Sequence, residues 1–250
     1  HYTEPLKRYL SGRFEMGTRQ GYREAIKNLD HPRGANCGDS SMVLSFVDQV
    51  VMRDERRPDF VALNCGLHDI KIDPATGLRQ VNEADYAANL ARIFERFILQ
   101  NIPVIWINTT PVPDERHRRC CPEIFRYEKD VVAYNAIAAK CALLHEVPVI
   151  DLHGFTENLG PDVYLDHVHY TIPARELQAA GARGLLVDRT GHEPVNVKRA
   201  RLLDRIQRGA AVLGVDLAEA GALQRAGLDQ VDGAALAARV GGSADRAQLQ

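Results

Sequence analysis

Val104-Ile105-Trp106-Ile107-Asn108 is the stretch that decides the fold class, because it is short, apolar and ends on a polar residue. Two further runs share its character, at residues 60–65 and 147–152. Nearly continuous apolar runs rich in β-branched residues are typical of strands buried on both faces of a parallel sheet. The three runs therefore predict three strands of one such sheet.

Helical patterns fill the intervals between these runs. One extends from an Asn82 cap to about Gln100 and the other from about Lys129 to His145, each with apolar residues at helical spacing. Strands that alternate with helices are joined by right-handed crossovers. We therefore predict an α/β fold with a doubly wound parallel sheet and helices on both of its faces.

The region before residue 60 contains shorter patterns. We predict helices over residues 2–10, 21–29 and 39–52, the last capped by Asp39 or Ser40, and a brief strand over residues 13–16.

Composition limits the classes of function. The 250 residues carry a net charge of −2 with 26% charged residues, which does not favour nucleic acid or an anionic membrane as a partner. The apolar runs are too short to span a bilayer. Five cysteines without zinc-type spacing favour reduced thiols and a cytosolic setting. His1 stands where an initiator Met is expected, so a targeting signal is expected to have been removed if one existed.

The character of the sequence changes after about residue 187. All 16 aromatic residues lie at or before Tyr170, and the remainder is rich in Ala, Arg and Leu. A segment without aromatic residues buries little apolar surface. We predict an α/β domain over residues 1–187 and a helical or partly disordered extension over residues 188–250.

The richest cluster of reactive side chains is Tyr164-Leu165-Asp166-His167-Val168-His169-Tyr170-Thr171, just before a helix with Pro173 in its first turn. Asp166 precedes His169 by three residues, a spacing that lets the carboxylate fold back onto imidazole Nδ1. That contact fixes the tautomer and stabilises the imidazolium formed when Nε2 takes a proton. A polar surface loop with incidental histidines is the alternative.

Two further segments place polar groups at strand ends, where open α/β sheets bind ligands. The run over residues 60–65 leads into Gly66-Leu67-His68-Asp69. Asn36-Cys37-Gly38-Asp39-Ser40-Ser41 offers free backbone N–H groups at a helix start, which suits an oxyanion.

These segments give the chain a resemblance to the SGNH (GDSL-type) hydrolases, serine esterases with a flavodoxin-like, three-layer α/β/α fold. Gly38 falls where that family has its oxyanion-hole glycine. Gly66-Leu67-His68-Asp69 resembles its Gly-x-Asn-Asp block, and Asp166-His167-Val168-His169 resembles its Asp-x-x-His block. The resemblance covers about residues 2–187.

The resemblance implies hydrolysis of an acyl ester through an acyl-enzyme, with no metal or organic cofactor. His169 is then the general base, Asp166 orients it, and Gly38 and His68 stabilise the oxyanion. His68 departs from the family, which has Asn there, so this donor becomes titratable. We expect Asp69 to support its loop through backbone hydrogen bonds, and we expect His167 to be structural.

The nucleophile block is a second departure. The family places Gly-Asp-Ser after its first strand, whereas no strand-like run precedes Gly38-Asp39-Ser40. The interval from Gly38 to His68 instead fits the family's second and third blocks. Ser40 is therefore a weak candidate nucleophile, better interpreted as a cap residue, and we expect the Gly-Asp-Ser block to lie upstream of His1.

A missing first strand has consequences for stability. In this fold that strand lies between the second and the third, so its removal leaves buried backbone groups unpaired at about 1–3 kcal/mol each. Net stability is only about 5–15 kcal/mol, so we expect a chain without this strand to be marginal and without activity.

Two alternatives from other classes stay open. A metallohydrolase would use clustered imidazoles and carboxylates to bind zinc or manganese. Its candidate ligands are His68, Asp69, Asp166, His167 and His169. The second alternative is a degenerate hydrolase fold that binds a ligand without turnover.

A basic segment is expected to be solvated surface rather than a site for an anionic substrate; it contains His117, Arg118, Arg119 and Arg126.

Overall fold

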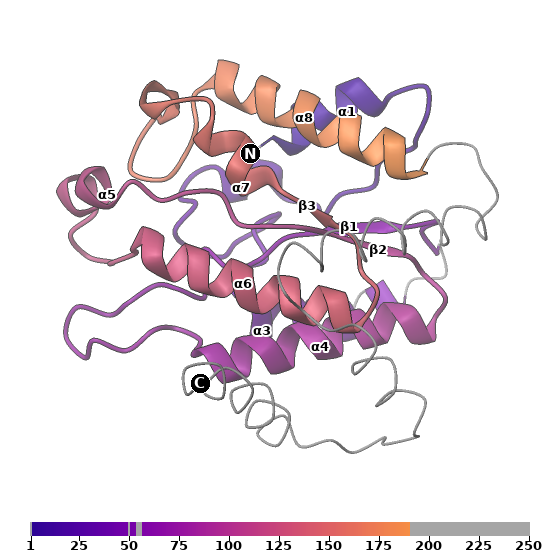
Figure 1. Cartoon of the computed structure of the whole chain (residues 1–250), viewed down its shortest axis with the longest axis horizontal. Coiled ribbons are helices and arrows are strands. Elements are labelled where there is room, and N and C mark those ends of the chain that lie inside the picture. The colour runs from indigo at the N-terminus through magenta and orange to yellow at the C-terminus, as the bar shows by residue number, and fades with distance from the viewer. Residues whose placement is uncertain (1, 50, 54–56, 191–250) are drawn as a thin grey trace, which may run out of the picture. The chain divides into compact units, whose positions relative to one another are not determined.

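The computed structural model describes residues 2–49, 51–53 and 57–190, and its centre is a parallel sheet (Figure 1). The strands are β1 (Val61–Leu63), β2 (Val104–Ile107) and β3 (Val149–Ile150), in the order β1-β2-β3. Val61 pairs with Val104, and Trp106 pairs with Val149, both in parallel register. The predicted strands and their parallel arrangement are thus confirmed.

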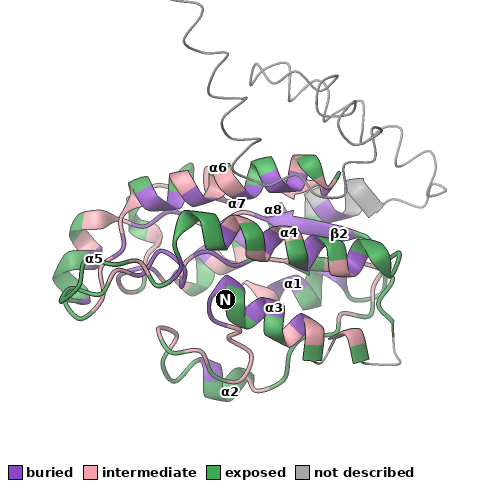
Figure 2. Ribbon diagram, turned by 90° about the horizontal axis from the view of Figure 1, so that it is seen from below, coloured by how far each residue is buried: buried purple, intermediate pink, exposed green. Residues whose placement is uncertain are grey.

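Helices cover both faces of this sheet, as predicted (Figure 1). One face carries α1 (Thr3–Leu10), α7 (Leu152–Glu157) and α8 (Ile172–Thr190). The other carries α3 (Ser40–Gln49), α4 (Glu83–Leu99) and α6 (Glu128–Leu144). Each face has its own buried apolar cluster, and all four residues of β2 are buried between them (Figure 2). Two short helices, α2 (Tyr22–Ala25) and α5 (Asp114–Cys120), and two 3₁₀ turns, Val51–Arg53 and Pro161–Val163, complete the described elements.

The helices α4 and α6 begin and end within a residue or two of their predicted bounds. The side chain of Asn82 accepts the backbone N–H of Asp85 at 2.9 Å and caps α4. A cap of this kind contributes about 1 kcal/mol. The buried stripe of α4 consists of Tyr86, Leu90, Ile93, Phe94 and Phe97.

Three shorter predictions need correction. Residues 13–16 form no strand, because they have no ladder partner among the described residues. The helix expected over residues 21–29 is limited to Tyr22–Ala25, and the one expected over residues 39–52 ends at Gln49. Phe14 still packs on the sheet layer, since its ring lies edge-on to Phe60 with 5.5 Å between centroids.

The outer edge of β1 is open in the described part of the chain. β1 pairs there with β2 alone, and Ala62 at its centre is exposed although every residue of β2 is buried. A central strand of a doubly wound sheet would be covered on both faces and paired on both edges. β1 is therefore an edge strand of the described sheet.

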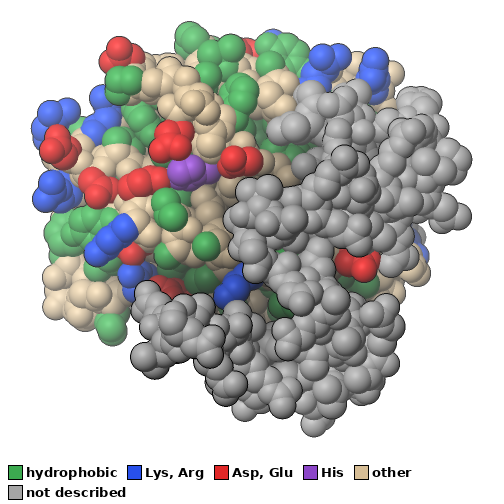
Figure 3. All heavy atoms as spheres, in the orientation of Figure 1, with side chains coloured by type: hydrophobic (Ala, Val, Ile, Leu, Met, Phe, Trp, Pro, Cys, Tyr) green, Lys and Arg blue, Asp and Glu red, His purple; other side chains and the backbone are tan. Residues whose placement is uncertain are grey.

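No helix in the described ranges has the length and apolar character that crossing a membrane requires. Acidic and basic side chains are interspersed on the face drawn in Figure 3.

The predicted extension falls almost wholly outside the described residues, so the division at residue 187 remains a prediction.

Candidate active site

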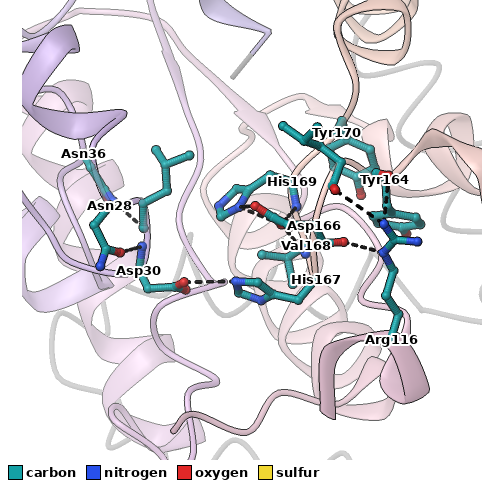
Figure 4. A network of polar contacts seen from close by, with 12 residues as sticks. Asn28, Asp30, Asn36, Arg116, Tyr164, Asp166, His167, Val168, His169 and Tyr170 are labelled. Atoms are coloured by element: carbon teal, nitrogen blue, oxygen red, sulfur yellow. Dashed lines mark hydrogen bonds and ion pairs between the residues drawn. The ribbon is translucent and has the colours of Figure 1, made fainter. Parts of the chain in front are cut away.

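The loop between the Pro161–Val163 turn and α8 brings Asp166 and His169 together (Figure 4). Imidazole Nδ1 of His169 lies 2.7 Å from Oδ2 and 2.9 Å from Oδ1 of Asp166. Asp166 Oδ1 also accepts the backbone N–H groups of His169 at 2.8 Å and Val168 at 3.0 Å. The carboxylate is therefore held by three donors, and it assigns the Nδ1–H tautomer to His169.

The same contacts set the charges of this pair. Burial alone would raise the pKa of Asp166, but the N–H groups of Val168 and His169 outweigh burial and leave the pKa below its ordinary value. Burial lowers the pKa of His169, although Asp166 opposes this effect. At neutral pH the pair is thus a carboxylate beside a neutral imidazole, the state that a general base requires.

Arg116 in α5 fixes the backbone of this loop. Its Nε donates to the carbonyl of Asp166 at 2.5 Å, and its Nη2 donates to the carbonyl of Tyr164 at 3.1 Å. Tyr164 and Tyr170 pair in an isolated antiparallel β-bridge, which closes the loop. Arg116 was missed in the sequence because nothing local distinguishes it from the other arginines of its basic segment.

His68 lies at the exit of β1 and is almost fully buried. Burial, followed by Lys71 and Arg126, lowers the pKa of His68 to about 3, so its ring is neutral at physiological pH. Asn36 Nδ2 lies 3.2 Å from His68 Nε2. An amide nitrogen only donates, so Nε2 accepts and the proton lies on Nδ1, a buried atom with no hydrogen-bond partner in the described structure. His68 therefore holds an unused donor.

Asn36, which the sequence did not single out, joins His68 to Gly38. The backbone N–H of Gly38 donates to Asn36 Oδ1 at 3.0 Å. Gly38 has φ 82°, a left-handed conformation that favours glycine, and a Cβ there would lie 2.9 Å from Pro32. The structure thus brings the two predicted oxyanion donors to opposite ends of one amide side chain.

Ser40 is the first residue of α3, and it is fully buried. Its N–H donates to Asp69 Oδ1 at 2.9 Å, and its hydroxyl accepts Asn89 Nδ2 at 3.0 Å. Asp39, rather than Ser40, caps the helix by accepting the N–H of Met42 at 3.0 Å. Ser40 thus forms part of the packing between α3 and the exit loop of β1.

Burial also raises the pKa of Asp69, to about 6, although its hydrogen bonds with Ser40 oppose the shift. An unfolded aspartate titrates near pH 3.9, so folding takes up a proton between the two values and stability falls as the pH rises through this window. Asp69→Asn retains an acceptor and carries no charge. The free energy of unfolding of this variant, compared with that of the parent chain, is therefore expected to be about 2 kcal/mol more favourable at pH 8 than at pH 4. Urea unfolding at both pH values measures this, and a pH-independent difference would contradict it.

Asp30 connects these loops, although no local pattern in the sequence points to it. Its Oδ2 lies 3.0 Å from His167 Nε2 (Figure 4). Its Oδ1 accepts Arg126 Nη2 at 2.8 Å. Arg126 Nε also donates to the carbonyl of Leu67 at 2.8 Å. His167 therefore has a structural contact, and Asp30 ties the loop of His169 to the exit of β1.

The predicted solvated basic segment needs correction at two positions. Arg126 and His117 are each only 1% exposed. Arg126 is internal because Asp30 and the Leu67 carbonyl satisfy its guanidinium, a partnership between segments far apart in sequence.

Tyr164, at the start of the loop that carries His169, lines an open cleft of about 650 Å³ whose walls do not include Asp166 or His169 themselves. Its walls include Pro111, Arg116, Arg119, Glu157 and Tyr164. This volume lies within the range of small-molecule sites.

Comparisons with known proteins agree with this fold. A family model described as GDSL-like lipase/acylhydrolase matches residues 4–181. The lipase/acylhydrolase from Enterococcus faecalis superposes with a TM-score of 0.53 at 18% identity, covering 78% of this chain and 88% of that one. LAE5, an α/β hydrolase from the metagenome of Lake Arreo in Spain, gives 0.50 at 16% identity, covering 73% and 79%. A search of curated proteins found no match.

Proposed function

The chain belongs to the GDSL-like lipase/acylhydrolase family, and from this premise we propose that it hydrolyses an acyl ester through a serine acyl-enzyme. The observation that carries the proposal is the contact between Asp166 and His169, together with the match of the family model. A carboxylate on Nδ1 leaves Nε2 of the neutral ring as the proton acceptor.

The proposed reaction has two steps. His169 Nε2 takes the proton of a serine hydroxyl as the oxygen attacks the ester carbonyl, and Asp166 stabilises the imidazolium. His169 then returns the proton to the departing alcohol oxygen, which leaves an acyl-enzyme. Water, deprotonated by the same imidazole, releases the acid and regenerates the serine.

His68 and Gly38 are the proposed oxyanion donors. The Nδ1–H of His68 has no partner in the described structure, so no existing bond has to break before it donates to a carbonyl oxygen. Because Nδ1 is buried in this structure, the proposal requires the ring or its loop to shift so that the substrate reaches it. The N–H of Gly38 is held by Asn36 Oδ1, and it must exchange that acceptor for the oxyanion. Asn36 is thus a positioning residue for both donors.

The role of His68 gives a specific prediction. In a version of the chain extended upstream by a strand that ends in Gly-Asp-Ser, His68→Ala is expected to lower kcat about 10²–10³-fold, the usual effect of losing one oxyanion donor. His68→Asn supplies a neutral amide donor and is expected to recover most of that loss. Initial rates with p-nitrophenyl acetate measure both variants. Equal activity of the Ala and Asn variants would show that the side chain donates nothing to the oxyanion.

Ser40 is a poor candidate for the attacking serine. Ser40 is fully buried and bonded to Asn89, so its hydroxyl has no exposed surface to offer a substrate. We therefore propose that the nucleophile belongs to a Gly-Asp-Ser block on a strand outside these 250 residues. The open edge of β1 supports this placement, because in the described sheet its backbone N–H and C=O groups have no neighbouring strand and are available to pair with one more.

Burst kinetics test this proposal. The 250-residue chain, its Ser40→Ala variant and a version extended upstream by a strand ending in Gly-Asp-Ser are mixed with p-nitrophenyl acetate. We expect a burst of p-nitrophenol from the extended version alone. A burst from the 250-residue chain that Ser40→Ala removes would instead make Ser40 the nucleophile. No burst and no steady turnover from any version would favour a hydrolase fold that binds without catalysis.

The substrate is proposed only as a class. The cleft combines apolar side chains such as Pro111 and Tyr164 with charged groups of both signs, so it offers apolar surface beside polar surface. Its charged residues are Arg116, Arg119, Asp114, Glu115, Glu157 and Asp162. Carbohydrate O-acetyl groups, short-chain esters and lysophospholipids all fit this description. A panel of these three ester types, tested on the version extended by a Gly-Asp-Ser strand, ranks them by kcat/KM. Arg119→Ala in the same version tests whether the charge of Arg119 contributes to the ranking.

A further inference from the structure

Three metal-binding side chains meet behind the loop of His169. His117 belongs to α5, Cys121 follows one turn later at the end of that helix, and His167 projects from the loop. One potential ligand atom from each of the three lies within 4.8 Å of the other two. The residues are 1%, 7% and 7% exposed, so the cluster is internal.

The nitrogen atoms in this cluster are not satisfied. Both ring nitrogens of His117 and Nδ1 of His167 are buried without a hydrogen-bond partner in the described part of the chain. Leaving a buried polar atom unpaired costs about 1–3 kcal/mol. The imidazole rings of His117 and His167 lie 4.8 Å apart between centroids and tilt by 35°. A bound cation would convert these unpaired atoms into ligands.

The surroundings of His167 prepare it to bind a metal. Its Nε2 lies 3.0 Å from Asp30 Oδ2, so Nε2–H donates to the carboxylate and the lone pair lies on Nδ1. A ligating histidine commonly donates its other ring N–H to a carboxylate, which fixes the tautomer and makes the ligand more basic. Arg126 in turn holds Asp30 at 2.8 Å.

We propose that His117, Cys121 and His167 bind a divalent transition metal of the zinc type. Two imidazoles and one thiolate are a ligand set that zinc favours, with a fourth position for water. Tetrahedral zinc at its usual bond lengths separates its ligand atoms by about 3.3–3.8 Å, so closure requires side-chain shifts of about 1 Å. Binding releases the thiol proton of Cys121 to solvent. The thiolate and Asp30 then offset most of the charge of the ion and Arg126.

Such an ion would act as a clamp rather than a catalyst. It would join the end of α5 to the residue that directly follows Asp166, so it would restrict the loop that carries the Asp166–His169 pair. The second candidate cluster, Asp166, His167 and His169, competes less well, because Asp166 and His169 already bond to each other. The proposal does not rest on ester hydrolysis, and its readouts need no substrate.

Cobalt titration tests the site directly. The 250-residue chain, freed of metal by a chelator under reducing conditions, is titrated with Co²⁺. We expect one equivalent to bind with a thiolate-to-cobalt charge-transfer band and the visible bands of a four-coordinate ion. Zinc should displace the cobalt and, at saturation, raise the melting temperature by at least about 5 °C. Binding without the thiolate band, or no zinc-dependent stabilisation, would overturn the proposal.

The adjacent cysteines give a matched control. Cys121→Ala is expected to remove the charge-transfer band and lower cobalt affinity at least about 100-fold, since even loss of an outer hydrogen bond costs about 10–100-fold. Cys120→Ala, at an exposed neighbour, should bind cobalt like the parent chain. His117→Gln provides a second ligand variant of similar size, and far-UV circular dichroism checks that each variant folds. Equal binding by Cys121→Ala and the parent chain would refute the assigned ligand set.

Discussion

His169→Ala is expected to lower kcat/KM for p-nitrophenyl acetate by about 10³–10⁴-fold in the version of the chain that carries a Gly-Asp-Ser strand. The ring is the only imidazole that the loop pairs with Asp166, through contacts of 2.7 and 2.9 Å. Without it the serine hydroxyl has no positioned base, and such a base contributes about 10²–10⁴-fold or more when it acts in a triad. Asp166→Asn should cost about 10²–10⁴-fold, because an amide cannot stabilise the imidazolium.

His145→Ala is the matched control for this variant. His145 also lies near a carboxylate, with its Nε2 3.8 Å from Glu95, but it packs against Phe94 at the end of α6. We expect its activity to remain within about threefold of the parent, since it contributes only local packing. The assignment of the general base would be wrong if the His169 variant retained more than about a tenth of the parent activity.

Arg126→Met is expected to lower the free energy of unfolding by about 3–5 kcal/mol, the largest effect on stability that we predict for a polar residue. The guanidinium is 1% exposed, and it donates to Asp30 and to the Leu67 carbonyl at 2.8 Å each. Its removal leaves a mostly buried carboxylate without its cationic partner. Urea unfolding in the presence of a chelator measures the loss without any contribution from bound metal.

Arg96→Met provides the comparison for this experiment. Arg96 pairs with Asp48 at 2.6 Å, yet both side chains are more than a third exposed. Exposed pairs contribute about 0–1 kcal/mol, so this variant should be nearly neutral. Asp30→Asn introduced beside Arg126→Met should restore part of the lost stability. Equal effects of the two arginine variants would show that burial does not set the strength of the Arg126 pair.

Local patterns were enough to predict the layers of the fold. Residues 104–108 and the Asn82 cap each contain the information that defines their element, so β2 and α4 formed where expected. Residues 13–16 have a strand-like pattern, but a strand also needs a partner, and none is present in the described chain. The sequence pattern of a segment alone does not predict whether a neighbouring strand is present to pair with it.

The site residues also fall into two groups, those whose contacts the local sequence predicts and those whose contacts it does not. Asp166 and His169 are three residues apart, so their contact followed from local geometry. Asp30 lies 137 residues from His167 and 96 residues from Arg126 in sequence, and no local signal links them. Arg126 was placed on the surface because an arginine is usually solvated, and the buried partner that overrides this preference is distant in sequence.

Labelling with a fluorophosphonate probe, followed by peptide mapping, tests the central claim most directly. The claim is that the Asp166–His169 pair activates a serine for attack on an acyl ester. In the version extended by a Gly-Asp-Ser strand, we expect the probe on the serine of that block, and His169→Ala should abolish the labelling while the fold persists by circular dichroism. Labelling that survives in the His169 variant, or a folded extended chain that takes up no probe, would contradict the account.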